Sequence, residues 1–243
     1  MTPGSSPRRS VRRRARLLGT AATVTAAALA VALSACSAPS TTAPRAEGGV
    51  APAASADDLR VAVVGDSLSA GRSGFLGNGL DDESWMTYAQ GDGVVFAGGW
   101  ARAGATVEQM AAAVSPVDAD VLVLMGGTND VRHGTRFAEA EASYESIIGT
   151  VGADRVLIAA IPPYQPAPEE AMDYEADLAS WAYGEGYPLI DPWLFARGAD
   201  GQWAPATSAD GIHPTAAGYE RLGRELHELI LDEAASPADS TRG

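Results

Sequence analysis

Cysteine and lysine are the scarcest side chains in this sequence of 243 residues. Cys36 is the only cysteine, so no disulfide can form within the chain, and an exported domain must be held by its core alone. Lysine is absent, because all 17 basic residues are arginine, and the 31 acidic residues leave a formal net charge of −14. So acidic a composition argues against nucleic acid as a partner, since phosphates need basic contacts. It also argues against electrostatic binding to anionic lipid.

The N-terminus has the layout of an export signal. Six arginines and no acidic residue precede Leu17, and residues 17–33 are uncharged and rich in Ala, Thr, Val and Leu. A basic start followed by an apolar run that is short for a membrane span is typical of such signals. The run ends in Leu33-Ser34-Ala35-Cys36, which resembles a bacterial lipobox. We therefore predict that residues 1–35 are a lipoprotein signal peptide and that a lipid on Cys36 anchors the chain to the outer face of the cell membrane.

Other routes of export stay open at this point. The signal peptide could instead be cut near Ala35 without lipidation, which would give a secreted protein, or it could remain as an uncleaved anchor. The paired arginines also permit a twin-arginine route. Removal of residues 1–35 would leave 11 arginines against 31 acidic residues, a formal charge of −20. Such a charge suits solubility at an exposed cell surface.

The rest of the chain reads as one domain between two irregular segments. Residues 36–58 are mainly Ala, Pro, Ser, Thr and Gly without periodicity, which predicts a flexible tether. Residues 234–243 have a similar composition and predict a disordered tail. The remaining segment, 59–233, has the length of a single domain and contains no internal repeat.

Short apolar runs alternate with helical patterns within 59–233. The predicted strands are 59–64, 94–97, 121–125, 155–161 and 187–190, and the predicted helices are 106–114, 137–151, 169–184 and 215–233. Three of the strands are almost wholly apolar, as expected for a parallel sheet that is covered on both faces. The alternation predicts a three-layer α/β/α sandwich around a five-stranded, mostly parallel sheet. Ligands of such sheets bind beyond the carboxyl ends of the strands.

A candidate nucleophile follows the first predicted strand. Ser67 stands in Gly65-Asp66-Ser67-Leu68-Ser69, which is not the Gly-x-Ser-x-Gly elbow of the α/β-hydrolases. A serine hydroxyl needs a base within hydrogen-bond reach before it can attack a carbonyl carbon. An alternative role for Ser67 or Asp66 is to cap the N-terminus of a helix, and Asp66 could cap while Ser67 reacts.

Only three histidines could serve as the base. His227 lies inside the last predicted helix, where a structural role is expected. His133 could face the site, but no carboxylate is placed to orient it. His213 has Asp210 three residues before it, and it is therefore the predicted base.

The segment Asp210-Gly211-Ile212-His213-Pro214 provides the third member of a triad. One short turn would bring the Asp210 carboxylate to Nδ1 of His213 and leave Nε2 free for Ser67. The carboxylate would then hold the tautomer and stabilise the imidazolium ion. Alternatively, Asp210 caps the helix that begins near Pro214.

Three donors could form an oxyanion hole. They are the backbone N–H of Ser67, the backbone N–H of Gly104 and the side-chain amide of Asn129. A glycine at position 104 lets the main chain approach a substrate closely. Asn129 could also be an ordinary turn residue. Together with the predicted triad, these donors indicate acyl transfer from an ester to water.

The sequence resembles the SGNH hydrolases, also called the GDSL esterase/lipase family. The resemblance rests on four blocks, which contain Ser67 in Gly-Asp-Ser, Gly104, Asn129 in Gly-Thr-Asn-Asp, and His213 with Asp210. It implies a flavodoxin-like sandwich and a serine esterase that needs neither a metal nor an organic cofactor. The second block departs from the family pattern, because it lacks the asparagine that often precedes its glycine and has Trp100-Ala101-Arg102-Ala103 there.

The substrate is suggested by aromatic residues. Trp85, Trp100, Trp193 and Trp203 fall in or near loops on the predicted active side. Aromatic rings stack on sugar faces, so a small-molecule or polysaccharide ester, in particular a carbohydrate O-acyl ester, is expected ahead of a lipid ester or a thioester, unless these rings merely pack the edge of the domain. Two other functions stay open, namely an acyltransferase that uses the same triad and a catalytically silent surface protein that binds glycans.

Overall fold

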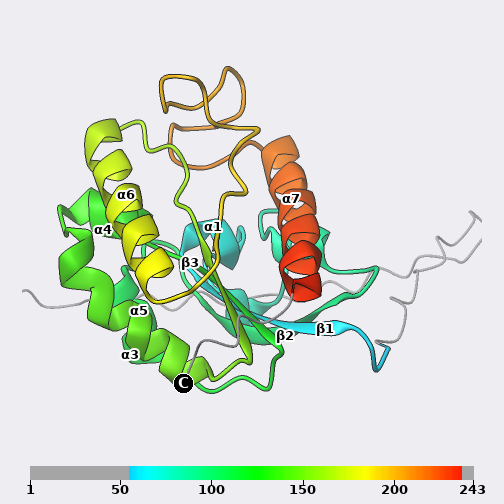
Figure 1. Ribbon diagram of the computed structural model, residues 1–243. Helices are drawn as coiled ribbons and strands as arrows, with labels where there is room; N and C mark the ends of the chain where they lie inside the picture. The colour runs from blue at the N-terminus through cyan, green and yellow to red at the C-terminus, as the bar shows by residue number, and fades with distance from the viewer. Residues whose placement is uncertain (1–54, 237–243) are drawn as a thin grey trace, which may run out of the picture. The chain divides into compact units, whose positions relative to one another are not determined.

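The computed structural model describes residues 55–236 (Figure 1). The predicted signal peptide, Cys36, most of the predicted tether and most of the predicted tail lie outside the described residues. These four assignments therefore stay predictions.

The domain is built on a five-stranded parallel sheet. Its strands are β1 (Leu59–Gly65), β2 (Val94–Ala101), β3 (Val121–Met125), β4 (Arg155–Ala159) and β5 (Leu189–Ile190). They lie in the order β2-β1-β3-β4-β5, and every pairing is parallel. The strand order steps outward in both directions from β1, as in a doubly wound fold, and the predicted five-stranded parallel sheet is confirmed.

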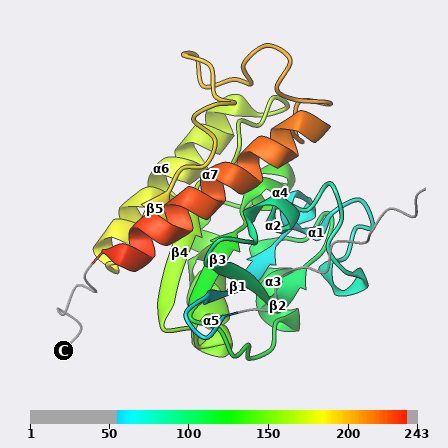
Figure 2. The same cartoon turned by 90° about the vertical axis from the view of Figure 1, so that its right-hand side faces the viewer.

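Helices cover both faces of the sheet and produce three layers (Figures 1 and 2). Successive side chains of β1 point to opposite faces, so Val61 and Val63 enter one apolar core while Ala62 and Val64 enter the other. The first core includes residues of α1 (Ser67–Ala70), α2 (Met86–Ala89) and α7 (Ala216–Ala235). The second includes residues of α3 (Val107–Ala113), α4 (Thr128–His133), α5 (Phe137–Val151) and α6 (Pro168–Gly184).

Local signals explain where the long helices begin and end. Thr106 caps α3 in a reciprocal capping box with Gln109, and Thr215 caps α7 by accepting a hydrogen bond from the Gly218 N–H. Helix α5 ends at Gly152, which has a left-handed φ of 72°. Helix α7 continues to Ala235, so the predicted tail boundary at 234 lies inside the last turn of this helix.

Strand β2 is longer than predicted, because it runs through Gly98 and Gly99 to Ala101. Glycine usually interrupts a strand pattern, which is why the sequence predicts an end at 97. Here the two glycines have φ values of 130° and 136°, and the register between β1 and β2 shifts at Val61/Ala62. A Cβ atom on Gly99 would lie 1.9 Å from the Val63 carbonyl oxygen. The glycine therefore permits a close approach of two strands.

Four short segments were not expected from the sequence, namely α1, α2, α4 and the 3₁₀ turn η1 (Leu76–Asn78). Each is too short to show the repeating apolar pattern that identifies a helix. Between residues 55 and 236, no helix combines the length and the apolar character needed to cross a membrane.

Candidate active site

The sequence-predicted site residues meet at the carboxyl edge of the sheet. Ser67 begins α1 directly after β1, Gly104 follows β2, and Asn129 lies in the first turn of α4 after β3. His213 comes from the loop that precedes α7, at the other end of the domain in sequence. This convergence is what the parallel topology predicts, because neighbouring parallel strands end at the same edge.

Ser67, His213 and Asp210 form a continuous hydrogen-bonded chain. The Ser67 Oγ lies 2.8 Å from Nε2 of His213, although the two residues are 146 positions apart. Nδ1 of His213 lies 2.8 Å from Oδ2 of Asp210. A carboxylate can only accept a hydrogen bond, so the proton sits on Nδ1 and leaves Nε2 to accept the serine hydroxyl. The order of groups is that of a nucleophile, a base and an orienting acid.

The loop that carries His213 is held by its own hydrogen bonds. Oδ1 of Asp210 accepts the backbone N–H groups of Ile212 and His213 at 2.9 and 2.7 Å. The Ser208 hydroxyl donates to the His213 carbonyl at 2.8 Å. Since Thr215 caps α7, the alternative that Asp210 caps this helix is wrong. Partial burial alone would raise the pKa of Asp210, but the hydrogen bonds from the His213 side chain and the backbone outweigh it and lower the pKa.

Two backbone N–H groups of the predicted site residues have no hydrogen-bond partner among the described residues. They belong to Ser67 and Gly104, neither of which donates a backbone hydrogen bond to another group in residues 55–236. Gly104 has a φ of 77° and open space where a Cβ would lie. The exposed main chain at Gly104 can thus approach a ligand without an intervening side chain.

Two hydrogen-bond acceptors hold the side-chain amide of Asn129 in place. Its Nδ2 donates to the Ala105 carbonyl at 3.0 Å and to Oδ2 of Asp66 at 3.2 Å. An amide nitrogen carries two hydrogens, so both are directed to protein oxygens in this structure. The longer contact, to Asp66, is the one that a ligand oxygen can more easily share.

Two buried carboxylates support this arrangement, and the sequence analysis assigned neither of them to it. Asp66 is only 1% exposed and also accepts the Leu68 N–H as the N-cap of α1. Asp130 accepts the Val107 N–H at 3.0 Å and thereby ties α4 to the start of α3. Burial raises the pKa of each to about 6. Asp66 lies in the Gly-Asp-Ser motif and Asp130 follows Asn129, so both were visible in the sequence. The contacts that these two carboxylates make depend on the fold.

The other two histidines lie apart from the triad. Nδ1 of His227 is 2.7 Å from the Ala89 carbonyl, where it joins α7 to the end of α2. His133 is exposed in the last turn of α4. In residues 55–236, no cluster of three or more His, Cys, Asp or Glu side chains is arranged to hold a metal ion.

The tryptophans differ from the expected sugar platform. Trp85 and Trp193 are fully buried, with their Nε1 atoms donating to Ser69 and Ala160. Trp203 packs edge-on against Trp193 and donates to the Gly211 carbonyl, so it supports the loop of His213. These three rings stabilise the domain, as the alternative in the sequence analysis states. Among the four, Trp100 is left as a candidate for substrate contact.

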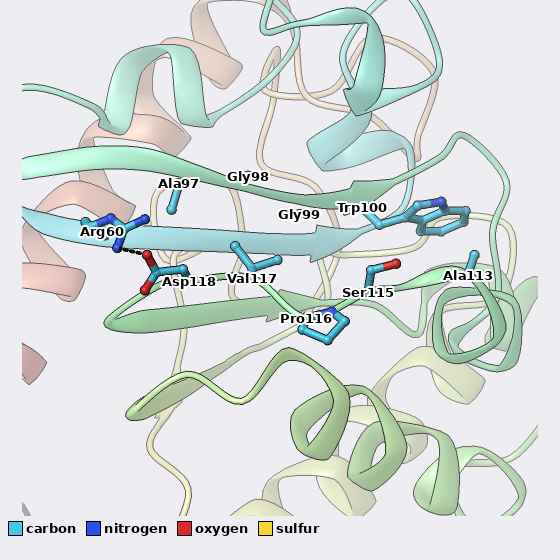
Figure 3. Close-up of a pocket in the computed structure, with 10 residues that line it drawn as sticks. All are labelled: Arg60, Ala97, Gly98, Gly99, Trp100, Ala113, Ser115, Pro116, Val117 and Asp118. Atoms are coloured by element: carbon cyan, nitrogen blue, oxygen red, sulfur yellow. Dashed lines mark ion pairs between the residues drawn. The ribbon is translucent and has the colours of Figure 1, made fainter.

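An open cleft of about 360 Å³ lies along the edge strand β2 (Figure 3). It is lined by residues 97–100 of β2, by Ala113 at the end of α3 and by residues 115–118 after it, and the ion pair between Arg60 and Asp118 lies at one end. No member of the Ser67-His213-Asp210 chain lines it. Trp100, near the carboxyl end of β2, is one of its lining residues.

Sequence comparison identifies the family. The profile of the GDSL-like lipase/acylhydrolase family matches residues 63–221, which include Ser67, Asn129 and His213. The chain belongs to this family. A search of curated proteins finds no match.

Solved structures share the fold of this GDSL-family domain at low sequence identity. A member of the lipolytic protein G-D-S-L family from Veillonella parvula has a TM-score of 0.55 and 21% identity over 71% of this chain and 98% of its own. A carbohydrate acetylesterase family member from Sinorhizobium meliloti has a TM-score of 0.53 and 19% identity over 71% and 97%. The inhibitor-bound aryl esterase of M. smegmatis has a TM-score of 0.53 and 17% identity over 72% and 99%.

The family and the fold expected from the four blocks are therefore confirmed. The geometry brings Ser67, His213 and Asp210 into hydrogen-bond contact, and it places Asn129 beside Asp66. The chemical roles of these residues stay predictions.

Proposed function

We propose that this GDSL-family protein is a serine esterase that hydrolyses carboxylic esters through Ser67, His213 and Asp210. The observation that carries the proposal is the pair of 2.8 Å contacts that joins Ser67 Oγ to Nε2 and Nδ1 to Asp210. In other settings a serine after a strand is a helix cap, but here Asp66 does the capping. The Ser67 hydroxyl is thus available for chemistry.

Acylation begins when Ser67 Oγ attacks the ester carbonyl carbon and its proton passes to Nε2 of His213. Negative charge develops on the carbonyl oxygen. The Ser67 and Gly104 N–H groups receive it, and Asn129 joins them by sharing the hydrogen of its 3.2 Å contact with Asp66. The C–O bond then breaks, and the leaving alcohol takes the proton from His213.

Deacylation repeats the cycle with water. His213 removes a proton from a water molecule, whose oxygen attacks the acyl carbon and forms the same oxyanion. The bond between the acyl carbon and Ser67 Oγ then breaks, the acid leaves, and the proton on Nε2 passes to Ser67 Oγ. Asp210 keeps Nδ1 protonated throughout and stabilises the transient imidazolium.

A carbohydrate O-acyl ester is the substrate class that we favour. Trp100, at the carboxyl edge of the sheet, is an aromatic ring that can contact a sugar. A structural neighbour is described as a carbohydrate acetylesterase family member, which supports the same class. An acyltransferase with the same triad would instead pass the acyl group to a sugar hydroxyl. Acetyl transfer exceeding release of free acetate in the presence of a sugar acceptor would favour that alternative.

The test is hydrolysis of p-nitrophenyl acetate and of acetylated xylan by the wild type and by Ser67→Ala, with Ser180→Ala as the matched control. Ser180 is an exposed serine of α6. Ser67→Ala is expected to fold and to lose turnover, since its side chain supplies the nucleophile, while Ser180→Ala keeps wild-type rates. Wild-type protein without turnover of any ester and without an adduct from a serine-directed phosphonate would favour the silent glycan-binding alternative.

For localisation, we propose export and lipid anchoring at Cys36, with secretion of an unlipidated chain as the alternative. The basic start, the short apolar run and the single cysteine after Leu33-Ser34-Ala35 support it.

A further inference from the structure

Arg102 is an arginine without a carboxylate partner in the part of the chain that the structure describes. Most other described arginines are ion-paired with Asp or Glu (Arg60, Arg72, Arg136, Arg197, Arg221 and Arg224). The Arg102 Nη2 instead lies at 3.5 Å from the Gln109 amide oxygen, at the limit of a hydrogen bond. Among the arginines of residues 55–236, Arg132 and Arg155 also have no ion pair with Asp or Glu, and Arg155 donates to the backbone carbonyls of Glu233 and Ser236. Arg102 differs from these two in its position.

Arg102 lies beside the proposed oxyanion hole. Its backbone N–H donates to the Gly65 carbonyl at 3.3 Å, two residues before the nucleophile. Gly104, with its free N–H, is two residues further along the same turn. Any ester whose carbonyl oxygen reaches Gly104 would therefore carry its other groups past this turn.

Aromatic rings hold the guanidinium in place. The Arg102 Cζ lies 5.5 Å from the centre of the Trp100 ring, and Phe75 meets the same ring edge-on at 6.4 Å. Phe75 is 37% exposed and is joined to Arg102 by an isolated antiparallel bridge. Figure 3 shows the Trp100 side chain reaching past the end of β1, toward the edge where Ser67 lies. Cation–π contact orients the charge without neutralising it.

We propose that Arg102, supported by Trp100 and Phe75, binds a carboxylate on the ester substrate, so that the enzyme prefers acidic esters such as those of acylated sugar acids. The proposal rests on the proposed esterase function and names its substrate class. The planar fork of a guanidinium matches a carboxylate. Without such a cation, the strongly negative chain would repel an anionic substrate.

The test compares matched esters that differ in one charge. On the alcohol side the pair is 4-acetoxybenzoate and its methyl ester, and on the acyl side it is the 4-nitrophenyl monoester of glutaric acid and 4-nitrophenyl pentanoate. For each pair the ratio of kcat/KM, anionic over neutral, is measured in the wild type and in Arg102→Gln. We expect the ratio for at least one pair to fall about fivefold in the variant, which is the size of an exposed charge pair. The pair that responds tells which side of the ester carries the carboxylate.

Arg224→Gln is the matched control, because Arg224 is an exposed arginine on α7 that pairs only with Glu220. It is expected to leave both ratios unchanged. Arg102→Lys should restore part of the preference, and added salt should reduce the preference in the wild type. Unchanged ratios in Arg102→Gln, with normal turnover of the neutral esters, would overturn the carboxylate site while leaving the esterase intact. The absence of turnover of all four esters by the wild type would instead refute the proposed function.

Discussion

Replacement of Asn129 by alanine tests the proposed oxyanion donor, whose Nδ2 also donates to two buried protein acceptors. Loss of one donor in other oxyanion holes slows turnover by about 10²–10³. Here the hydrogen that would reach the oxyanion is shared with Asp66 at 3.2 Å. We therefore expect kcat to fall by about 10², the lower end of that range.

The same substitution also has a cost in stability. It removes the donor from two buried acceptors, the Ala105 carbonyl and Oδ2 of Asp66. An unsatisfied buried polar group costs about 1–3 kcal/mol, which for a domain of this size lowers the Tm by several degrees. The Ser67–His213 contact does not involve Asn129, so labelling of Ser67 by a phosphonate should still go to completion.

The assay is single-turnover and steady-state hydrolysis of p-nitrophenyl acetate, with thermal unfolding followed by circular dichroism. Asn78→Ala is the control, since Asn78 is the other asparagine of the chain and is exposed in η1. It should behave like the wild type in both assays. If Asn129→Ala is folded and its kcat stays within about threefold of the wild type, the oxyanion role of Asn129 is refuted.

Three further predictions concern glycines, acid stability and anchoring. Gly104→Ala should stay folded and lose about 1 kcal/mol of stability because of the φ of 77° at this position, but its kcat/KM should fall. Gly99→Ala should unfold, because its Cβ would lie 1.9 Å from the Val63 carbonyl oxygen. Equal melting temperatures of the two variants in scanning calorimetry would contradict this difference. Burial raises the pKa of Asp130 from 3.8 to about 6. As the pH falls from 6 toward 4, Asp130 is therefore protonated in the folded protein but still ionised in the unfolded chain, and the folded protein gains stability. In urea titrations the Asp130→Asn variant should lack up to about 3 kcal/mol of that gain in the free energy of unfolding. Parallel pH profiles of this free energy for the wild type and the variant would contradict the prediction. Cys36→Ala should move the protein from the membrane fraction to the medium, and unchanged membrane retention would reject the lipid anchor.

The sequence could predict the layout of this domain because its strong signals are local. Buried parallel strands are almost wholly apolar, so β3 is predicted at its observed bounds, and the apolar spacing of 137–151 predicts α5 equally well. The end of β2 could not be predicted in this way. Gly98 and Gly99 interrupt the pattern, and their fit against β1 is visible only once the two strands are paired.

The candidate site likewise contains residues that local patterns predict and contacts that depend on the fold. Local patterns were sufficient to predict Ser67 after the first strand, and His213 as the one histidine of three with an aspartate, Asp210, three residues before it. The contact between Asn129 and Asp66 joins residues 63 positions apart, and no local pattern indicates it. The burial of Trp85 and Trp193 likewise depends on how α2, α7 and the sheet pack, so composition alone could not tell a core ring from a binding ring.

The proposed esterase function depends on Ser67 as the nucleophile of an acyl-transfer reaction. Its most direct test is mass spectrometry of the intact protein after treatment with a fluorophosphonate, with the adduct located by peptide mapping. We expect one adduct for each chain, on Ser67, with loss of ester hydrolysis in step with labelling. An adduct confined to another residue, or full hydrolysis by protein in which Ser67 is completely labelled, would contradict it.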